Sequence, residues 1–184
     1  MAKIETERLW LRRWRDGDLG PYARICADPE VMRYLGGPRS REDCKQQLAR
    51  FAAHWERWGC GLWAAEEKAS GALVGRIGLM HHDEWHEGEG EREVEVGWLL
   101  ARSQWGRGLA TEGALASLGH GFDAFGLARV ISIVRPDNAA SRRVMEKCGL
   151  TLRGASRFRG IDVVWYAIDR STWQARLACG EVGA

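Results

Sequence analysis

The sequence QWGRGLAT, residues 104–111, joins a strand-like run that ends at Leu100 to a helical run that begins near Ala110. Its glycines permit backbone conformations closed to other residues and let a ligand approach the amides closely. The helix that follows begins with unpaired N–H groups and about half a positive charge. This segment therefore predicts a site for an anion such as a pyrophosphate, to which Arg107 would add a cation.

Two common phosphate-binding loops do not fit this segment. A Walker A loop requires G-x-x-x-x-G-K-[ST], which does not occur in the sequence. A dinucleotide fingerprint requires G-x-G-x-x-G directly after a strand, but residues 106–111 lack the third glycine and follow a loop over 101–105. Residues 105–110 instead resemble the acyl-coenzyme A loop of the GNAT acetyltransferases, [QR]-x-x-G-x-[GA]. The final four positions match, and Trp105 departs from the first.

Length and composition predict one soluble domain over residues 1–184. A net charge of +2, with 45% apolar and 28% charged residues, excludes a strong nucleic-acid or anionic-membrane footprint. No run approaches the ~18 apolar residues that a membrane helix needs. Five cysteines without a C-x-x-C pair are typical of free thiols in a reducing compartment. We therefore expect a cytoplasmic protein that binds neither nucleic acid nor membrane.

Hydrophobic periodicity predicts alternating strands and helices through the whole chain, and therefore an α/β domain. Strands are expected over 7–14, 62–66, 72–80, 93–100, 130–134, 150–153 and 163–168. Helices are expected after Asp28-Pro29, after the capping-box pattern at Ser40, over 110–125, over 138–148 and from about 171. The charged run 81–92 is expected to be a loop or hairpin tip.

Four segments resemble the RimJ/RimL branch of the GNAT superfamily, in the same order along nearly the whole chain. Residues 6–12 (TERLWLR) are similar to its T-E-R-L-x-L-R start, and residues 95–98 (EVGW) to its E-[IV]-G-[YW] strand. Residues 105–112 (WGRGLATE) are similar to W-G-x-G-x-A-T-E, in which tryptophan at the first position is usual. Residues 138–150 (NAASRRVMEKCGL) are similar to N-x-x-S-x-x-[VL]-x-E-K-x-G-[FL].

The resemblance implies a mixed, mostly antiparallel sheet flanked by helices and splayed between strands 93–100 and 130–134. It also implies acetyl-CoA as acyl donor. One strand would pair its backbone with the pantetheine arm, and the amides of the loop would hold the pyrophosphate. The coenzyme-binding residues that it implies are Trp98, Leu99, Leu100, Trp105, Gly106, Arg107, Gly108, Leu109, Ala110, Thr111, Asn138 and Arg142. Glu112, close to the anion, is expected to point away from it.

Two residues are candidates for proton transfer. The resemblance makes Glu95 the base that receives the amine proton, with Glu93 on the same strand face as its rival. Both are also compatible with solvated strand glutamates. The resemblance implies that Ser141 protonates the departing thiolate. Many GNAT enzymes carry a tyrosine four positions later for this task, and here that position is Met145, so the acid is either Ser141 or no residue of this helix.

Several other candidate residues can have a purely structural role as well as a functional one. Asn138 is a good N-cap as well as a pantetheine contact, and Ser141 is an ordinary first-turn residue. The amide of Leu99 would stabilise the developing oxyanion. Cys148 is expected to pack in the core rather than act as a nucleophile.

A histidine-rich run offers a candidate metal site that the pattern does not favour. His81, His82 and His86, with acids at 83, 84 and 87, lack the H-E-x-x-H order and lie in the expected loop. We therefore expect no metal.

The sequence thus predicts an N-acetyltransferase that moves the acetyl group of acetyl-CoA to a primary amine by direct attack in a ternary complex. The acceptors that the resemblance implies include the N-terminal α-amine of a protein or peptide, and also small amines. A non-catalytic acyl-CoA-binding domain is the alternative. The oligomeric state, monomer or homodimer, is left open.

Overall fold

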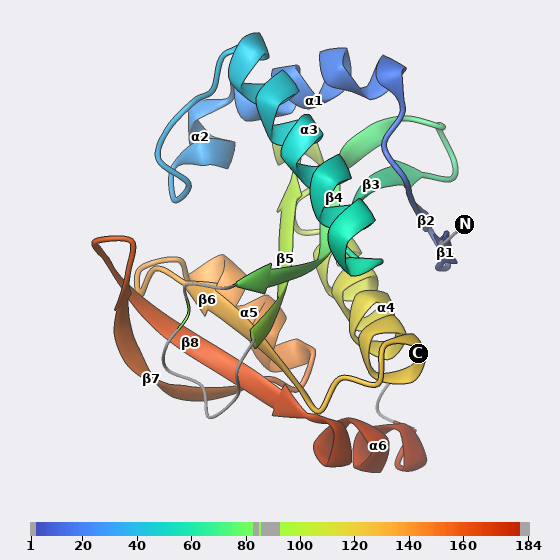
Figure 1. Cartoon of the computed structure of the whole chain (residues 1–184), viewed down its shortest axis with the longest axis vertical. Coiled ribbons are helices and arrows are strands. Elements are labelled where there is room, and N and C mark those ends of the chain that lie inside the picture. Colours follow the sequence, from blue (N-terminus) through green and yellow to red (C-terminus); the bar gives the residue numbers. More distant parts are fainter. Residues whose placement is uncertain (1–2, 83–84, 86–92, 181–184) are drawn as a thin grey trace.

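The central sheet decides the architecture of the protein (Figure 1). The computed structural model describes residues 3–82, 85 and 93–180, and these form one eight-stranded sheet in the order β1-β2-β3-β4-β5-β6-β8-β7. Neighbouring strands are antiparallel except β5 and β6. The strands are β1 (Ile4–Glu5), β2 (Leu9–Arg12), β3 (Leu62–Glu67), β4 (Leu73–His82), β5 (Glu93–Leu100), β6 (Arg129–Val134), β7 (Thr151–Phe158) and β8 (Ile161–Asp169).

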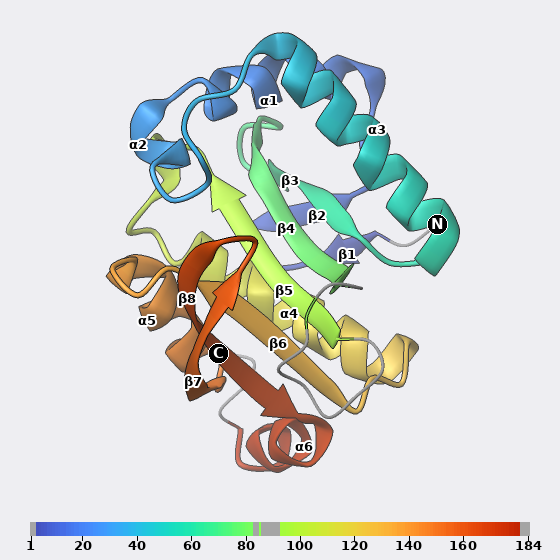
Figure 2. The same ribbon diagram turned by 60° about the vertical axis from the view of Figure 1, so that its left-hand side comes forward.

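Helices cover both faces of this sheet (Figure 2). The α-helices are α1 (Leu19–Cys26), α2 (Pro29–Met32), α3 (Arg41–Trp58), α4 (Leu109–Ala124), α5 (Ala139–Lys147) and α6 (Arg170–Ala178). Helix α3 begins at the predicted capping box, where the Ser40 hydroxyl accepts a hydrogen bond from the amide of Asp43 at 3.1 Å. It ends at Gly59, whose φ of 69° favours glycine.

Helix α4 packs closely on one face of the sheet because it carries glycines where it crosses β4. A Cβ at Gly113 would lie 2.4 Å from Cδ1 of Ile77, and one at Gly121 would lie 3.1 Å from Leu79. Helices α1–α3 pack on the opposite face, in a cluster that includes Leu62 and Leu99. Residues of β5 therefore alternate between the two layers, and Leu99 faces α1–α3.

The sheet is splayed between β5 and β6. In the described part of the chain these parallel strands form a backbone pair only at Glu95 and Ile131. Two hydrogen bonds that involve side chains also join them, one of 2.9 Å from Ser132 Oγ to the carbonyl of Val96 and one of 3.2 Å from the amide of Ile133 to Oε1 of Glu95. Beyond this point β5 stays with β4 as far as Leu100, and β6 stays with β8. The predicted fold, a mixed and mostly antiparallel sheet that opens between these strands, is confirmed.

Some predicted boundaries are wrong. The strand predicted over 7–14 is β2, only four residues long, and the two-residue strand β1 precedes it. Trp14 lies beyond the end of β2, where its indole N–H donates to the carbonyl of Leu62 at 2.9 Å. Strands β7 and β8 are longer than predicted and form a hairpin that turns at Arg159 and Gly160, both with positive φ. Strand β4 continues to His82, so two residues of the expected loop are strand. The rest of that loop, apart from Trp85, lies outside the described residues.

A buried ion cluster ties the turn after β2 to the sheet. The Arg12 guanidinium donates to both carboxylate oxygens of Asp18, at 2.7 and 2.8 Å, and to Glu66 at 2.6 Å. Burial acts to raise the pKa of Asp18, but hydrogen bonds from Arg12 and from the amide of Arg15 outweigh it, so this pKa is lowered.

None of the helices in the described ranges has the length and hydropathy that crossing a bilayer requires.

Candidate active site

The loop between β5 and α4 forms a cradle of backbone amides. Gly106 and Gly108 have φ values of 73° and 82°, in the left-handed region that glycine adopts without strain. Gly108 is the N-cap of α4. Among the described residues, the amides of residues 106–111 donate no hydrogen bond to the chain, and a Cβ at Gly106 would meet no protein atom within 4 Å. Backbone amides arranged in this way at a helix N-terminus are suited to bind an anion such as a pyrophosphate.

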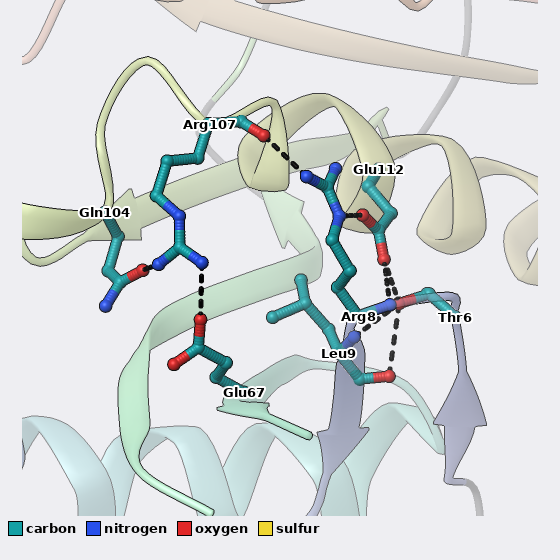
Figure 3. Close-up of polar contacts among 7 residues, drawn as sticks. All are labelled: Thr6, Arg8, Leu9, Glu67, Gln104, Arg107 and Glu112. Carbon is teal, nitrogen blue, oxygen red and sulfur yellow. Dashed lines mark hydrogen bonds and ion pairs between the residues drawn. The ribbon is translucent and has the colours of Figure 1, made fainter. Parts of the chain in front are cut away.

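The side chain of Arg107 points away from this cradle. It donates to Oε1 of Glu67 on β3 at 2.7 Å and to Oε1 of Gln104 (Figure 3). The carbonyl of Arg107 accepts a hydrogen bond of 2.8 Å from the Arg8 guanidinium. The expectation that the Arg107 side chain adds a cation to the anion site is therefore wrong in this structure, whereas its amide keeps its place in the cradle.

Trp105 links the loop to the end of β5. Its indole N–H donates to the carbonyl of Leu100 at 3.0 Å, while about half of the residue, 48%, stays exposed. Glu112, in the first turn of α4, points away from the cradle as expected, since its carboxylate binds Thr6 and Arg8.

The backbone of β5 faces the opening only at alternate residues. The carbonyl of Val96 accepts from Ser132 on β6, so Val96 and, two and four residues on, Trp98 and Leu100 face the opening. The carbonyl of Leu99 points at β4, where a Cβ on Gly75 would lie 2.0 Å from it. Leu99 was expected to contact the pantetheine arm and donate to an oxyanion, and its backbone direction contradicts both roles.

Glu95 lies where β5 and β6 separate. Its Oε1 accepts a hydrogen bond of 3.2 Å from the amide of Ile133, and its Oε2 is hydrogen-bonded to Nε2 of His82. The His82 ring packs edge-on against Phe158, with centroids 5.5 Å apart. The side chains of Glu95 and His82 are only 21% and 13% exposed, so Glu95 is not a solvated surface glutamate.

Glu93, the rival base, has a different environment. It is only 4% exposed, and its Oε1 lies 3.8 Å from Nη1 of Arg129. Burial raises the pKa of Glu93, and Arg129 opposes this shift only in part. The structure therefore separates the two glutamates: Glu95 lies at the opening, and Glu93 is buried beside the start of β6.

The start of α5 lies after the diverging end of β6. Asn138 caps the helix, with its Oδ1 accepting from the amide of Ser141 at 3.2 Å, which leaves the NH₂ group of Asn138 for another acceptor. Arg142 Nε donates to the hydroxyl of Tyr166 at 3.0 Å, so this predicted coenzyme contact braces α5 against β8. Met145 is 2% exposed in the core.

An aromatic cluster that contacts His82, the partner of Glu95, was not predicted. Trp85 packs edge-on against Phe158 and Trp165, with centroids 5.6 and 5.9 Å apart, so that Trp85 contacts both strands of the β7–β8 hairpin. On the sequence, Trp85 lies in a charged run and the other two lie in later strands. No local pattern joins them, because the cluster depends on the order of strands in the sheet.

The candidate metal-site residues are used elsewhere or lie outside the described residues. The His81 ring stacks on Trp58, with centroids 4.3 Å apart, and His82 binds Glu95. His86 and the acids at 83, 84 and 87 lie outside the described residues. Within the described ranges, no three potential ligands come together as a metal site.

Cys148 packs in the core, as predicted. It is fully buried among the residues of the main cluster. Burial raises the pKa of its thiol to about 12, so the thiolate that a nucleophile needs is disfavoured.

Comparisons with known proteins agree with this geometry. Residues 8–151 match the acetyltransferase (GNAT) domain family. The uncharacterized N-acetyltransferase YoaA of Bacillus subtilis (strain 168) is 31% identical over 156 residues, which cover 84% of this chain and 85% of that protein. An acetyltransferase from Agrobacterium tumefaciens str. C58 superposes with a TM-score of 0.80 at 28% identity, over 91% of this chain and 94% of that one.

A third similar structure is RimJ of Mycobacterium smegmatis in complex with CoA-disulfide. It has a TM-score of 0.74 at 21% identity, over 98% of this chain and 95% of that one, a likeness that shows the fold alone. The family match spans most of the chain and includes the loop, the splayed strands and the start of α5. The chain belongs to the GNAT acetyltransferase family and is an acetyl-CoA-dependent acetyltransferase.

Proposed function

We propose that this chain, as one domain over residues 1–184, transfers the acetyl group of acetyl-CoA to the N-terminal α-amine of a protein or peptide by direct attack in a ternary complex. The observation that carries the proposal is the placement of Glu95. This carboxylate is held at the point where β5 and β6 separate. The far end of the same strand, β5, leads into the amide cradle of residues 106–111.

The coenzyme binds along β5 and the loop that follows it. The amides of Gly106, Arg107, Gly108, Leu109, Ala110 and Thr111 donate to the pyrophosphate. The backbone groups of Trp98 and Leu100 that face the opening pair with the pantetheine arm as an added strand does. The NH₂ group of Asn138 donates to the same arm. Trp105 holds the end of β5 through its hydrogen bond to the carbonyl of Leu100, and Arg142 holds α5 in place through Tyr166.

Proton transfer from the amine falls to Glu95. Acetyl-CoA supplies the thioester carbonyl and a thiolate leaving group, and attack requires a neutral amine. An α-amine has an ordinary pKa of about 7.7–8.0 against about 10.4 for lysine, so it requires less help to lose its proton. Glu95, held by Ile133 and His82, receives that proton directly or through one water. The amide of Trp98, which faces the opening, takes the oxyanion role expected of Leu99.

Proton delivery to the thiolate falls to Ser141. Its hydroxyl lies in the first turn of α5, after the diverging end of β6, and its backbone amide is held by Asn138. A positioned hydroxyl that passes its proton to the sulfur as the C–S bond breaks, and takes a proton from solvent water in the same step, leaves a neutral thiol and an intact serine. Met145 in the core offers no proton, and Tyr166 is occupied by Arg142 and Glu146.

The α-amine acceptor rests on the RimJ/RimL resemblance in four segments and on the shared fold with RimJ. A direct test incubates acetyl-CoA with the protein and measures CoA release with a thiol reagent. Peptides with a free α-amine are compared with their N-acetylated forms that retain a lysine, and with small polyamines. Release with free α-amine peptides only supports the proposal. Release with lysine-bearing blocked peptides or polyamines only would contradict it.

A further inference from the structure

Arg8 and Glu112 bind each other and so connect the segment before β2 to the first turn of α4 (Figure 3). Arg8 lies just before β2, and Glu112 lies in the first turn of α4, 104 positions later. Nε of Arg8 donates to Oε2 of Glu112 at 2.7 Å, and the amide of Arg8 donates to Oε1 at 2.7 Å. The hydroxyl of Thr6 donates to the same Oε1 at 2.5 Å. Two of the four segments that carry the family resemblance, 6–12 and 105–112, thus bind each other here.

The guanidinium of Arg8 reaches beyond Glu112 to the loop itself. Its Nη1 donates to the carbonyl of Arg107 at 2.8 Å, and its Nη2 lies 3.4 Å from the position of a Cβ on Gly108. The carbonyl of Arg107 and the N–H of Gly108 belong to one planar trans peptide unit and point in opposite directions. A hydrogen bond that holds the carbonyl on one side therefore fixes the N–H on the other side.

This peptide unit requires such a restraint. Gly108 follows it, and Gly106 lies one residue before it, both with positive φ. Glycine passes between backbone conformations with little steric resistance, so a peptide flanked in this way rotates easily. A charged donor on the carbonyl also polarises the peptide and strengthens the hydrogen bond that its N–H donates.

We propose that Arg8 is a positioning residue for the coenzyme: by binding the carbonyl of Arg107 it aims the Gly108 amide at the pyrophosphate, and Glu112 holds Arg8 in that place. The inference rests on the proposed coenzyme site and names a residue from outside the loop that completes it. It also explains why a glutamate is compatible with the first turn of a helix that binds an anion. The charge of Glu112 is paired with Arg8, and its side chain is only 14% exposed.

Arg102 provides the matched control. It is an exposed arginine in the short 3-10 turn Arg102–Gln104 between β5 and the cradle, and the proposed coenzyme contacts do not include it. If bulk positive charge near the loop were what the coenzyme requires, both arginines would contribute. If positioning of the Gly108 amide is what matters, only Arg8 contributes.

The experiment compares two ligands across three proteins. Affinity for CoA is measured by calorimetry, and affinity for pantetheine, which lacks the phosphates, by ligand-observed NMR, in the wild type, Arg8→Ala and Arg102→Ala. We expect Arg8→Ala to raise the Kd for CoA about tenfold, or about 1.4 kcal/mol, while its Kd for pantetheine stays within about twofold of wild type. Arg102→Ala is expected to change neither Kd by more than about twofold.

Three outcomes would overturn the inference: an unchanged Kd for CoA in Arg8→Ala, an equal loss for pantetheine, or an equal loss in Arg102→Ala. Failure of the wild type to bind CoA would instead contradict the proposed coenzyme site. If Arg8→Ala does not fold, Glu112→Gln takes its place. This variant keeps an oxygen for the amide of Arg8 but removes the charge that orients the guanidinium, and it is expected to show the same loss for CoA alone.

Discussion

Glu95 and His82 lie on neighbouring strands and are hydrogen-bonded through Oε2 and Nε2 at the point where the sheet opens. The other carboxylate oxygen of Glu95 accepts from the amide of Ile133 on β6. One side chain is therefore held from both halves of the sheet. A base held in this way reaches the reaction with its orientation already set, so little reorganisation is needed when the proton moves.

Glu95→Gln tests this assignment. Glutamine keeps the shape of the side chain and an oxygen for the amide of Ile133, but it does not take up a proton. We expect the rate of CoA release to fall about 10²-fold at neutral pH and to recover in part at high pH, where the α-amine is already neutral. The pH profile of kcat/KM with a free α-amine peptide measures both effects.

Glu93→Gln is the matched control, with the same substitution on the same strand and face. Its side chain is buried beside Arg129, and its rate is expected to stay within about twofold of wild type. A larger loss of rate in Glu93→Gln than in Glu95→Gln would contradict the assignment of Glu95 and would indicate that Glu93 is the base.

Ser141→Ala tests the proposed proton donor without disturbing the helix. The cap hydrogen bond from the backbone amide of Ser141 to Asn138 survives the change, because alanine keeps that amide. We expect kcat to fall about 10- to 100-fold with the KM for acetyl-CoA little changed. Asn138→Ala should behave differently, losing about 1 kcal/mol of stability along with coenzyme affinity. An unchanged kcat in Ser141→Ala would exclude this hydroxyl as the acid.

Asp18→Asn tests the buried cluster around Arg12. The change removes the charge that the guanidinium contacts through two nitrogens, and it leaves Arg12 with Glu66. We expect the free energy of unfolding to fall by about 3 kcal/mol at pH 7. Chemical denaturation of both proteins measures this difference.

The same pair predicts a pH dependence. The pKa of Asp18 is lowered in the folded protein, so its stabilising effect is complete above the ordinary aspartate value of about 3.9 and is lost as the pH falls through the folded value. The difference between wild type and Asp18→Asn should therefore shrink below about pH 4. Asp16→Asn, at an exposed position two residues earlier, is the control and should change stability by less than about 0.5 kcal/mol. A constant difference down to low pH would contradict the account.

Gly106→Ala tests the cradle. The φ of 73° costs a non-glycine residue about 1–2 kcal/mol, and the new methyl group would meet no protein atom. It would instead occupy the space through which a phosphate approaches the amides, so we expect at least a tenfold loss of acetyl-CoA affinity by calorimetry. Gly71→Ala, with a φ of 67° and equally open surroundings in the β3–β4 turn, is the matched control. It should lose similar stability but bind acetyl-CoA normally, and equal losses of affinity would contradict the cradle.

The features that were predictable from sequence depend on neighbours in the chain. The capping box at Ser40, the glycines of the loop and the Asn138 cap each follow from residues within a few positions of one another. The family resemblance added the splay, which local periodicity does not contain.

The features that were missed depend on distant partners. The direction of the Arg107 side chain is set by Glu67, 40 positions earlier, and the backbone direction of Leu99 by which neighbour β5 pairs with. His82, the partner of Glu95, was expected in a loop, because the predicted strand ended at residue 80 whereas β4 continues to His82. Such contacts follow from sheet order and register, which hydrophobic period does not encode.

Thermal unfolding with and without acetyl-CoA tests the central claim most directly. At about 100 times its Kd, a ligand that binds only the folded state adds about 2.7 kcal/mol, which for a domain of this size raises Tm by roughly 5–11 °C. The account predicts this rise for the wild type with acetyl-CoA, no rise with NAD, and a much smaller rise at the same acetyl-CoA concentration in Gly106→Ala. No rise with acetyl-CoA, or an equal rise in Gly106→Ala, would contradict the placement of the coenzyme in this cradle.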